Sequence, residues 1–346
     1  MNFKKFIIKL IIVVSFIIPN TVLAYSKYVI PGGETIGIEV NSKGILVIGF
    51  YKVNNVYTAK NAGFKTNDII IEVNNQKVST IDEMTNIIKE INSPTIKFKV
   101  LRKSKEKVIE LPLNYDENNI LKTGLYVKDK INGIGTLSYI DPTTKIFGSL
   151  GHEIIESSTA TKFEIKDGTI YEANVSSITK SKVGNAGEKN ATYNKDNISG
   201  EINANTVSGI YGTYLDEINE NNTIEIADKE NVTTGEALIK TVIKENKVED
   251  FTINIININK DHQTKNILFE ITDERLLEET GGIIQGMSGS PIIQNNKLVG
   301  AVNYVVLNDP SKGYGISIWS PLLVLYIIFI LYKKRLIKVF LVFAFF

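Results

Sequence analysis

The spacing of apolar residues divides the chain into two regions. Residues 44–53 (GILVIGFYKV) form an apolar, β-branched run that is typical of a buried strand. Residues 81–91 carry apolar side chains at every third or fourth position, which predicts a helix. Two more strands, residues 95–101 and 107–113, follow around a charged hairpin. These elements predict a small α+β domain within residues 28–113.

The second region, residues 125–318, has a different pattern. Short apolar runs recur between turns rich in Gly, Asn and Asp, and helical spacing is scarce. Regularly spaced short strands are typical of a β-barrel or a β-sandwich. The polar segment 114–124 separates the two regions and is predicted to be a linker. We therefore expect a mainly β chain in which a small α+β domain precedes an all-β domain.

Both ends of the chain are apolar. Residues 1–24 combine a Lys-containing start, a short apolar core and small residues near Ala24, which is the pattern of an export signal. We expect cleavage after Ala24; the alternative is a retained anchor, although a full membrane span needs about 20 apolar residues. Residues 319–346 form an atypical tail of apolar stretches around a basic one. This tail is interpreted either as a membrane-associating segment or as the product of a reading-frame change.

The composition limits the chemistry that this chain can perform. Lys and Arg number 39 against 38 Asp and Glu, so the net charge of +1 gives no indication of a nucleic-acid partner. The absence of cysteine excludes disulfides, thiolate nucleophiles and cysteine-based zinc sites. With only two histidines, His152 and His262, a histidine-rich metal centre is not expected either. We expect no metal and no cofactor.

Three short segments carry candidate catalytic residues. His152 follows an apolar strand and a glycine, Asp273 ends a predicted strand, and Ser288 lies in the turn Gly-Met-Ser-Gly-Ser-Pro. A serine hydroxyl becomes a nucleophile when a histidine accepts its proton, and a carboxylate can orient that histidine. The turn glycines let the amides of Gly286 and Ser288 point at one spot as an oxyanion hole. The sequence therefore predicts a serine endopeptidase with His152 as base, Ser288 as nucleophile and Asp273 as the orienting carboxylate.

Other interpretations of these residues remain open. His152 could be a structural histidine, and Ser288 could cap a tight turn. Three further aspartates could supply the carboxylate in place of Asp273, namely Asp228, Asp250 and Asp309. His262 lies in a polar hairpin tip and is interpreted as a surface residue. The order His, Asp, Ser matches that of chymotrypsin-like peptidases, whereas the turn lacks the Gly-x-Ser-x-Gly pattern of α/β-hydrolases.

The first region resembles a PDZ domain of the kind attached to bacterial proteases. Residues 59–70 (AKNAGFKTNDII) fit the pattern of a small residue, Gly, an apolar residue, two variable residues, Gly or Asn, Asp and an apolar residue. In PDZ domains a peptide adds a strand to the sheet while loop amides hold its C-terminal carboxylate. The resemblance implies that this loop is formed by Glu34, Thr35, Ile36 and Gly37.

From about residue 28 to residue 318 the chain resembles the SpoIVB peptidases, the stage IV sporulation serine proteases of endospore-forming bacteria. The strings that carry this resemblance are YVIPGG (28–33), GIGT (133–136), GSLGH (148–152), GGIIQGMSGSPI (281–292), NDP (308–310) and GYG (313–315). The resemblance implies a PDZ domain followed by a chymotrypsin-like double β-barrel. It also places the family's catalytic residues at His152, Asp273 and Ser288.

The same resemblance implies a biological role. Such proteins act after export from the forespore, in the space between the two spore membranes. There they cleave themselves and a membrane-bound regulator, which triggers sigma-factor processing in the mother cell. The partners expected for this chain are therefore a membrane-bound sporulation regulator and a second copy of itself.

The sequence departs from the family pattern at two places. Asn303 and Tyr304 stand where the family tends to have a histidine, and we expect this change to affect packing. The tail after residue 318 replaces a short family-like ending. Two other functions are kept as alternatives: a non-catalytic exported PDZ adaptor that binds peptide C-termini, and a membrane-tethered structural protein of the spore envelope.

Overall fold

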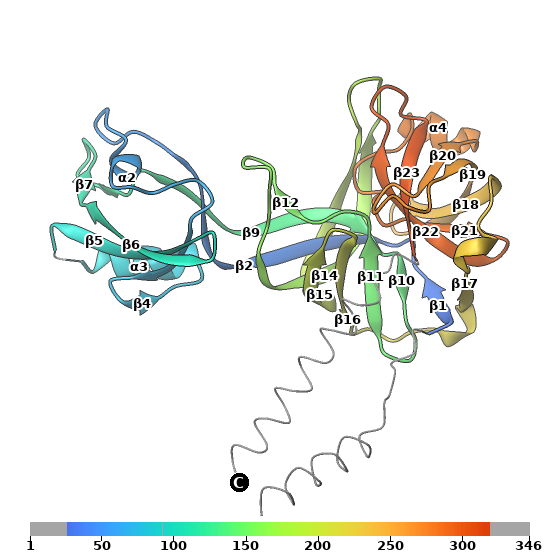
Figure 1. Cartoon of the computed structure of the whole chain (residues 1–346), viewed down its shortest axis with the longest axis horizontal. Coiled ribbons are helices and arrows are strands. Elements are labelled where there is room, and N and C mark those ends of the chain that lie inside the picture. Colours follow the sequence, from blue (N-terminus) through green and yellow to red (C-terminus); the bar gives the residue numbers. More distant parts are fainter. Residues whose placement is uncertain (1–25, 92, 319–346) are drawn as a thin grey trace, which may run out of the picture. The chain divides into compact units, whose positions relative to one another are not determined.

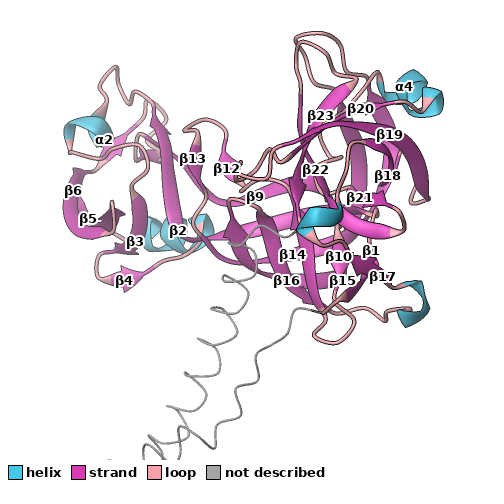
Figure 2. Cartoon of the chain, turned by 45° about the vertical axis from the view of Figure 1, so that its right-hand side comes forward, coloured by secondary structure: helices cyan, strands magenta, loops and turns pink. Residues whose placement is uncertain are grey.

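The computed structural model describes residues 26–91 and 93–318. The expected export signal within residues 1–24 and the tail at residues 319–346 lie outside the described residues. Strands make up most of the described chain and helices are short and few, as Figure 2 shows. The mainly β fold expected from the sequence is confirmed.

A first closed ring of antiparallel strands begins and ends at the same strand, β2. In ring order its strands are β2 (Thr35–Phe50), β14 (Ile165–Thr179), β15 (Glu188–Thr206), β16 (Gly209–Tyr214), β11 (Ile146–Leu150), β10 (Tyr139–Ile140) and β9 (Leu125–Thr136). Strands β9 and β10 follow each other in the chain with two residues between them. Because β9 pairs with β2 and β10 pairs with β11, this stretch of chain closes the ring. A closed barrel leaves no unpaired strand edge.

The second ring is also antiparallel throughout. Its order is β18 (Gly235–Val242), β19 (Val248–Ile258), β20 (Ile267–Ile271), β23 (Lys312–Ser317), β22 (Lys297–Val305) and β21 (Pro291–Gln294), and β21 pairs with β18 again. The strands of both rings are labelled in Figure 1. The two rings are the double β-barrel that the sequence resemblance implied.

Each barrel encloses its own apolar core. Alternate residues of each strand point inward, so every strand contributes a few branched or aromatic side chains to one barrel interior. The first core includes Val40, Phe147 and Ile170, and the second includes Ile253, Phe269 and Met287. All six of these side chains are buried.

The PDZ fold lies between strands β2 and β9 in the chain. Its elements are α2 (Thr58–Asn61), β3 (Ile69–Val73), β4 (Gln76–Lys77), α3 (Ile81–Lys89), β5 (Thr95–Arg102) and β6 (Lys105–Pro112). A third apolar core, which includes Ile45, Phe98 and Leu125, joins these elements to the PDZ ends of β2 and β9. Thr80 caps α3 through a capping box with Glu83.

Strand β2 contributes to both the barrel and the PDZ fold. Its residues 35–41 pair with β9 and β14 of the first barrel, whereas Leu46–Phe50 pair with the start of β9 beside the PDZ core. The segment 114–124 that was expected to be a linker contains a small hairpin formed by β7 (Asn114–Tyr115) and β8 (Leu121–Lys122).

The remaining elements lie around these three cores. They are β1 (Tyr28–Pro31), β12 (Ile155–Glu156), β13 (Thr161–Lys162), β17 (Ile224–Ile226), the 3₁₀ turns η1 (Glu220–Asn222) and η2 (Lys229–Asn231), and α4 (Glu274–Thr280). In the part of the chain that the structure describes, every helix is too short or too polar to cross a bilayer.

Candidate active site

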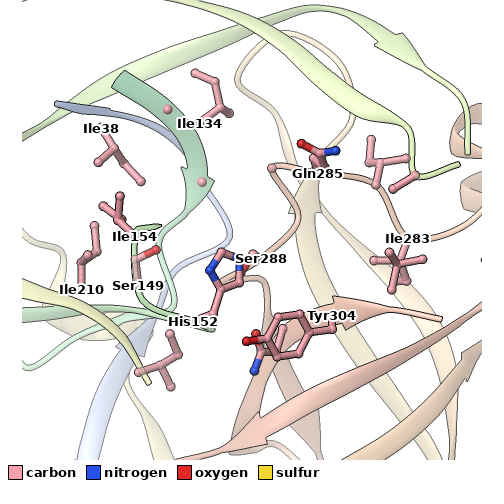
Figure 3. Close-up of a pocket in the computed structure, with 18 of the residues that line it drawn as sticks. Ile38, Ile134, Ser149, His152, Ile154, Ile210, Ile283, Gln285, Ser288 and Tyr304 are labelled. Carbon is pink, nitrogen blue, oxygen red and sulfur yellow. The ribbon is translucent and has the colours of Figure 1, made fainter. Parts of the chain in front are cut away.

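His152 and Ser288, which are 136 positions apart in the sequence, line the same cavity. The cavity has a volume of about 380 Å³, and Figure 3 shows both side chains in it together with Tyr304. Its wall is mostly aliphatic and includes Ile38, Ile131, Ile134, Ile154, Ile210, Ile283 and Ile284. A few polar side chains, among them His152 and Ser288, are thus set into a mostly apolar wall, which is a common arrangement in binding and catalytic sites.

The His152 ring lies just beyond the end of β11 and is held by two contacts. Its Nδ1 lies 2.9 Å from the carbonyl oxygen of Glu153, and its ring stacks on that of Tyr304 with 5.3 Å between the ring centres. Because a carbonyl can only accept a hydrogen bond, Nδ1 carries the proton in this contact. In the neutral ring the other nitrogen, Nε2, is then the basic one.

Ser288 lies in a turn that backbone hydrogen bonds tie to β9 of the first barrel and to β22 of the second. The amide of Thr136 donates to the carbonyl of Ser288 at 3.0 Å, and the amide of Gly289 donates to Val302 at 2.9 Å. A Cβ atom on Gly151 would lie 2.3 Å from the Ser288 hydroxyl oxygen. The hydroxyl thus occupies the space beside Gly151, the residue directly before His152.

The two amides expected to form an oxyanion hole are not used elsewhere in the described structure. Within residues 26–91 and 93–318, the N–H groups of Gly286 and Ser288 donate to no protein acceptor. The turn is strongly curved at this point, since Gly286 and Gly289 have φ angles of +89° and +100°. Unused amides beside the half-buried Ser288 hydroxyl are groups that can bind a developing oxyanion.

The structure does not bring Asp273 to this cavity. Asp273 caps helix α4, and its carboxylate accepts from the Arg275 side chain at 2.8 and 3.1 Å. The hydrogen bond from Arg275 holds the pKa of Asp273 below its ordinary value. The carboxylate is therefore engaged at the start of a helix, and the predicted role in orienting His152 gains no support from this placement.

The other aspartates considered from the sequence also lie outside the cavity lining. Asp250 pairs with Lys240, Asp309 pairs with Lys312, and Asp228 accepts from Asn231. His262, which was interpreted as a surface residue, is exposed, and its Nδ1 accepts from the amides of Thr264 and Lys265.

The predicted PDZ peptide loop requires a correction. Thr35, Ile36 and Gly37 belong to β2 and are paired on one or both sides by neighbouring strands of the first barrel. Thr35 is 2% exposed, and the carbonyl of Glu34 accepts from the amide of Leu137. Because these backbone groups already form hydrogen bonds with neighbouring strands of the barrel, this segment is not a loop that can hold a peptide carboxylate.

Sequence reasoning did not assign a role at the site to three neighbours of the catalytic pair. Tyr304 stacks on His152, and Asn303 lines the cavity while its side-chain amide donates to Thr264. Lys189 lies fully buried beneath the turn at Gly286. Sequence alone gave no signal for Lys189, because it stands in a polar run (GEKN) that is typical of an exposed strand.

Comparison with models of known protein families identifies the family of this chain. The family model described as SpoIVB peptidase S55 matches residues 119–322, which include His152, Asp273 and Ser288. This chain belongs to the SpoIVB peptidase family. A second model, described as a PDZ domain, matches residues 35–113, so a PDZ domain precedes the peptidase domain as expected. Family and site together support serine peptidase activity.

Other comparisons add less. A search of curated proteins finds no match. Among solved structures, the chain is similar to Rv3671c from M. tuberculosis H37Rv, solved as a serine-to-alanine variant in an inactive form, with 12% identity. That match covers 55% of this chain and 78% of the other, and its TM-score is 0.29.

The described residues contain no cluster of three or more His, Cys, Asp or Glu side chains that could hold a metal ion.

Proposed function

We propose that the chain is an exported endopeptidase of the sporulation pathway that uses Ser288 as nucleophile and His152 as general base. Its substrates are proposed to be a membrane-bound regulator of sigma-factor processing and a second copy of the chain itself. The observation that carries the proposal is the meeting of the two side chains at one cavity, with the Ser288 hydroxyl packed against Gly151.

The reaction follows from these positions. The Ser288 oxygen attacks the carbonyl carbon of the substrate peptide bond, and Nε2 of His152 accepts the hydroxyl proton. The amides of Gly286 and Ser288 bind the resulting oxyanion. When the intermediate collapses, the C–N bond breaks and His152 returns the proton to the leaving amine. Water then attacks the acyl-enzyme with the same base, and Ser288 is regenerated.

A backbone carbonyl takes the orienting role that a carboxylate has in many serine proteases. Glu153 accepts the Nδ1 proton of His152, which fixes the tautomer with a basic Nε2. A neutral carbonyl stabilises the imidazolium less than a carboxylate does, so we expect the catalytic base to be weaker than in a full triad. The mostly aliphatic cavity wall favours an uncharged aliphatic side chain of the substrate.

Location and partners rest on other features. The N-terminal pattern supports export, and family membership supports action in the forespore intermembrane space. The PDZ domain supports recognition of a peptide segment in the substrate or in a second copy. The alternative, a non-catalytic PDZ adaptor, leaves the apolar cavity and the His152–Ser288 pair without a role.

Replacement of the nucleophile tests the proposal. Wild type, Ser288→Ala and Ser290→Ala are purified and incubated, and self-cleavage products are identified by mass spectrometry. Ser290 is the matched control, since it lies in the same turn and its buried hydroxyl has no partner among the described residues. We expect products from wild type and Ser290→Ala and none from Ser288→Ala. Equal self-cleavage by Ser288→Ala would remove Ser288 from the nucleophile role.

A further inference from the structure

Lys189 on β15 is the most deeply buried basic side chain near the active-site turn. Only 4% of the residue is exposed. Its Nζ contacts the hydroxyl oxygens of Thr241 at 2.9 Å, Thr35 at 3.2 Å and Thr136 at 3.5 Å. These three threonines are themselves buried. Within the described residues, no carboxylate bonds to this amine.

A buried lysine without a carboxylate partner is costly to the fold, because its charge loses hydration that hydroxyl groups only partly replace. Burial alone lowers the pKa of Lys189 to about 7. The proposed mechanism gives this residue no part in proton transfer. Because burying the Lys189 amine costs stability, we looked for a role for it among the groups that it contacts.

Thr136 connects Lys189 to the active-site turn. Its hydroxyl donates to the carbonyl oxygen of Gly286 at 2.6 Å, and its amide donates to the carbonyl of Ser288 at 3.0 Å. The hydroxyl has a single proton, which it gives to Gly286. It can therefore only accept from Lys189, whose amine donates.

Lys189 also holds the turn directly. Its backbone amide donates to the carbonyl of Gln285 at 3.0 Å. Because the peptide bond is planar and trans, fixing the Gln285 carbonyl fixes the direction of the Gly286 N–H, which points the opposite way. The side-chain methylenes of Lys189 lie 3.2–3.3 Å from where a Cβ atom on Gly286 would be. The peptide groups on both sides of Gly286 are thus held by Lys189 and Thr136.

We propose that Lys189, acting through Thr136, is a positioning residue that holds the Gly286 N–H in the oxyanion hole. This inference rests on the proposed function of Ser288 and adds the groups that prepare its oxyanion hole. Neither Lys189 nor Thr136 touches the substrate. Both act by preventing the turn from rotating the Gly286 amide away from the developing charge, since oxyanion stabilisation depends on donors that are already in place.

The test measures the rate at which a fluorophosphonate forms a covalent adduct with the protein. Mass spectrometry of the intact protein follows the reaction. In this reaction the serine oxygen bonds to phosphorus, fluoride leaves, and His152 accepts the hydroxyl proton. The phosphoryl oxygen occupies the oxyanion hole, so the rate reports on that hole. The variants are Lys189→Met, Thr136→Val and Thr136→Ser, with Ser290→Ala as the matched control because the buried Ser290 hydroxyl lies in the same turn and has no partner among the described residues.

We expect Lys189→Met and Thr136→Val to slow labelling by about 10-fold to 100-fold, approaching the loss caused by removing one oxyanion donor. Thr136→Ser keeps the hydroxyl and is expected to label within about 3-fold of wild type, as is Ser290→Ala. Wild-type rates in Thr136→Val, or an equally slow Thr136→Ser, would overturn the proposal. If Lys189→Met does not fold, the two Thr136 variants decide alone. Failure of wild type to label at Ser288 would instead refute the proposed function itself.

Discussion

At the scale of single residues, the active site depends on a glycine that no side chain can replace. Gly151 has a φ angle of +147°, and a Cβ atom there would lie 2.3 Å from the Ser288 hydroxyl oxygen. That separation is far below van der Waals contact, so any larger residue must displace the nucleophile. In the sequence Gly151-His152, packing thus requires the glycine and the proposed catalysis requires the histidine.

Gly151→Ala is expected to reduce fluorophosphonate labelling of Ser288 by about 100-fold or more, since a displacement of about 1 Å can cost that much. The strained backbone should also lower the free energy of unfolding by about 1–3 kcal/mol. Labelling rate and urea unfolding measure the two effects. Gly49→Ala is the control, because Gly49 lies outside the cavity lining and a Cβ there would make only an ordinary contact with Tyr126 at 3.4 Å. Wild-type labelling by Gly151→Ala would contradict the described position of the hydroxyl.

Residue patterns predicted part of this site. A glycine-rich serine turn and one well-placed histidine were enough to select Ser288 and His152. Spacing could not show which group orients His152, because that group is a backbone carbonyl, which every residue carries. Nor could it find Lys189, whose burial depends on three threonines from three different strands.

At the scale of elements, Asp273 belongs to the start of helix α4. Its carboxylate accepts from the amide of Arg275 at 3.0 Å, the cap interaction that satisfies an otherwise unpaired helix N–H. The left-handed Gly281 ends the same helix after seven residues. A helix this short depends strongly on its caps.

Asp273→Ala is expected to lower the free energy of unfolding by about 1 kcal/mol through loss of the cap, and to leave Ser288 labelling near the wild-type rate. Asp273→Asn keeps a capping oxygen and should be closer to wild type in stability. Arg275 lowers the pKa of Asp273, so the carboxylate stabilises the fold above its unfolded pKa. This stabilisation is lost as the pH falls through the lower, folded pKa.

The opposite outcome has a clear meaning. If Asp273→Asn folds like wild type and yet loses labelling, Asp273 is the third catalytic residue, as the family resemblance implied. The described ion pair with Arg275 would then have to open when substrate binds. Asp250→Asn is the matched control, because Asp250 lies near the same helix and pairs with Lys240.

Element patterns predicted the PDZ helix well and strand β2 poorly. Apolar spacing placed a helix at residues 81–91, and the structure has one at Ile81–Lys89. For strand β2, the sequence alone predicts a loop in its first part and a strand in its second, because glycines interrupt the apolar run. Only its pairing with β9 and β14, which are distant in the sequence, shows that Thr35–Gly37 serve the barrel.

At the scale of the whole molecule, Lys189 links the two barrels beneath the active site. Thr35 and Thr136 lie on β2 and β9 of the first barrel, and Thr241 lies on β18 of the second. The charged residues next to these threonines in the chain are Glu34, whose pKa is raised by burial, and the half-buried Lys240, which pairs with Asp250. On its own strand, the neighbouring Glu188 is exposed.

This burial predicts how stability depends on pH. Lys189 has a pKa of about 7 in the folded state and the ordinary value of 10.5 when unfolded. Between these values the unfolded chain binds more protons, so the free energy of unfolding rises as pH increases from about 7 to 10.5. Urea unfolding across that range measures the rise. It should be smaller in Lys189→Met, and an identical rise in both proteins would contradict the described burial.

The central claim is that Ser288 attacks and His152 removes its proton, and the most direct measurement maps a fluorophosphonate adduct onto the chain by peptide mass spectrometry. The predicted result is an adduct on Ser288 in wild type and in His262→Ala, whose histidine lies on an exposed turn, and none in His152→Ala. An adduct on another residue, or equal labelling of Ser288 in His152→Ala, would contradict the account.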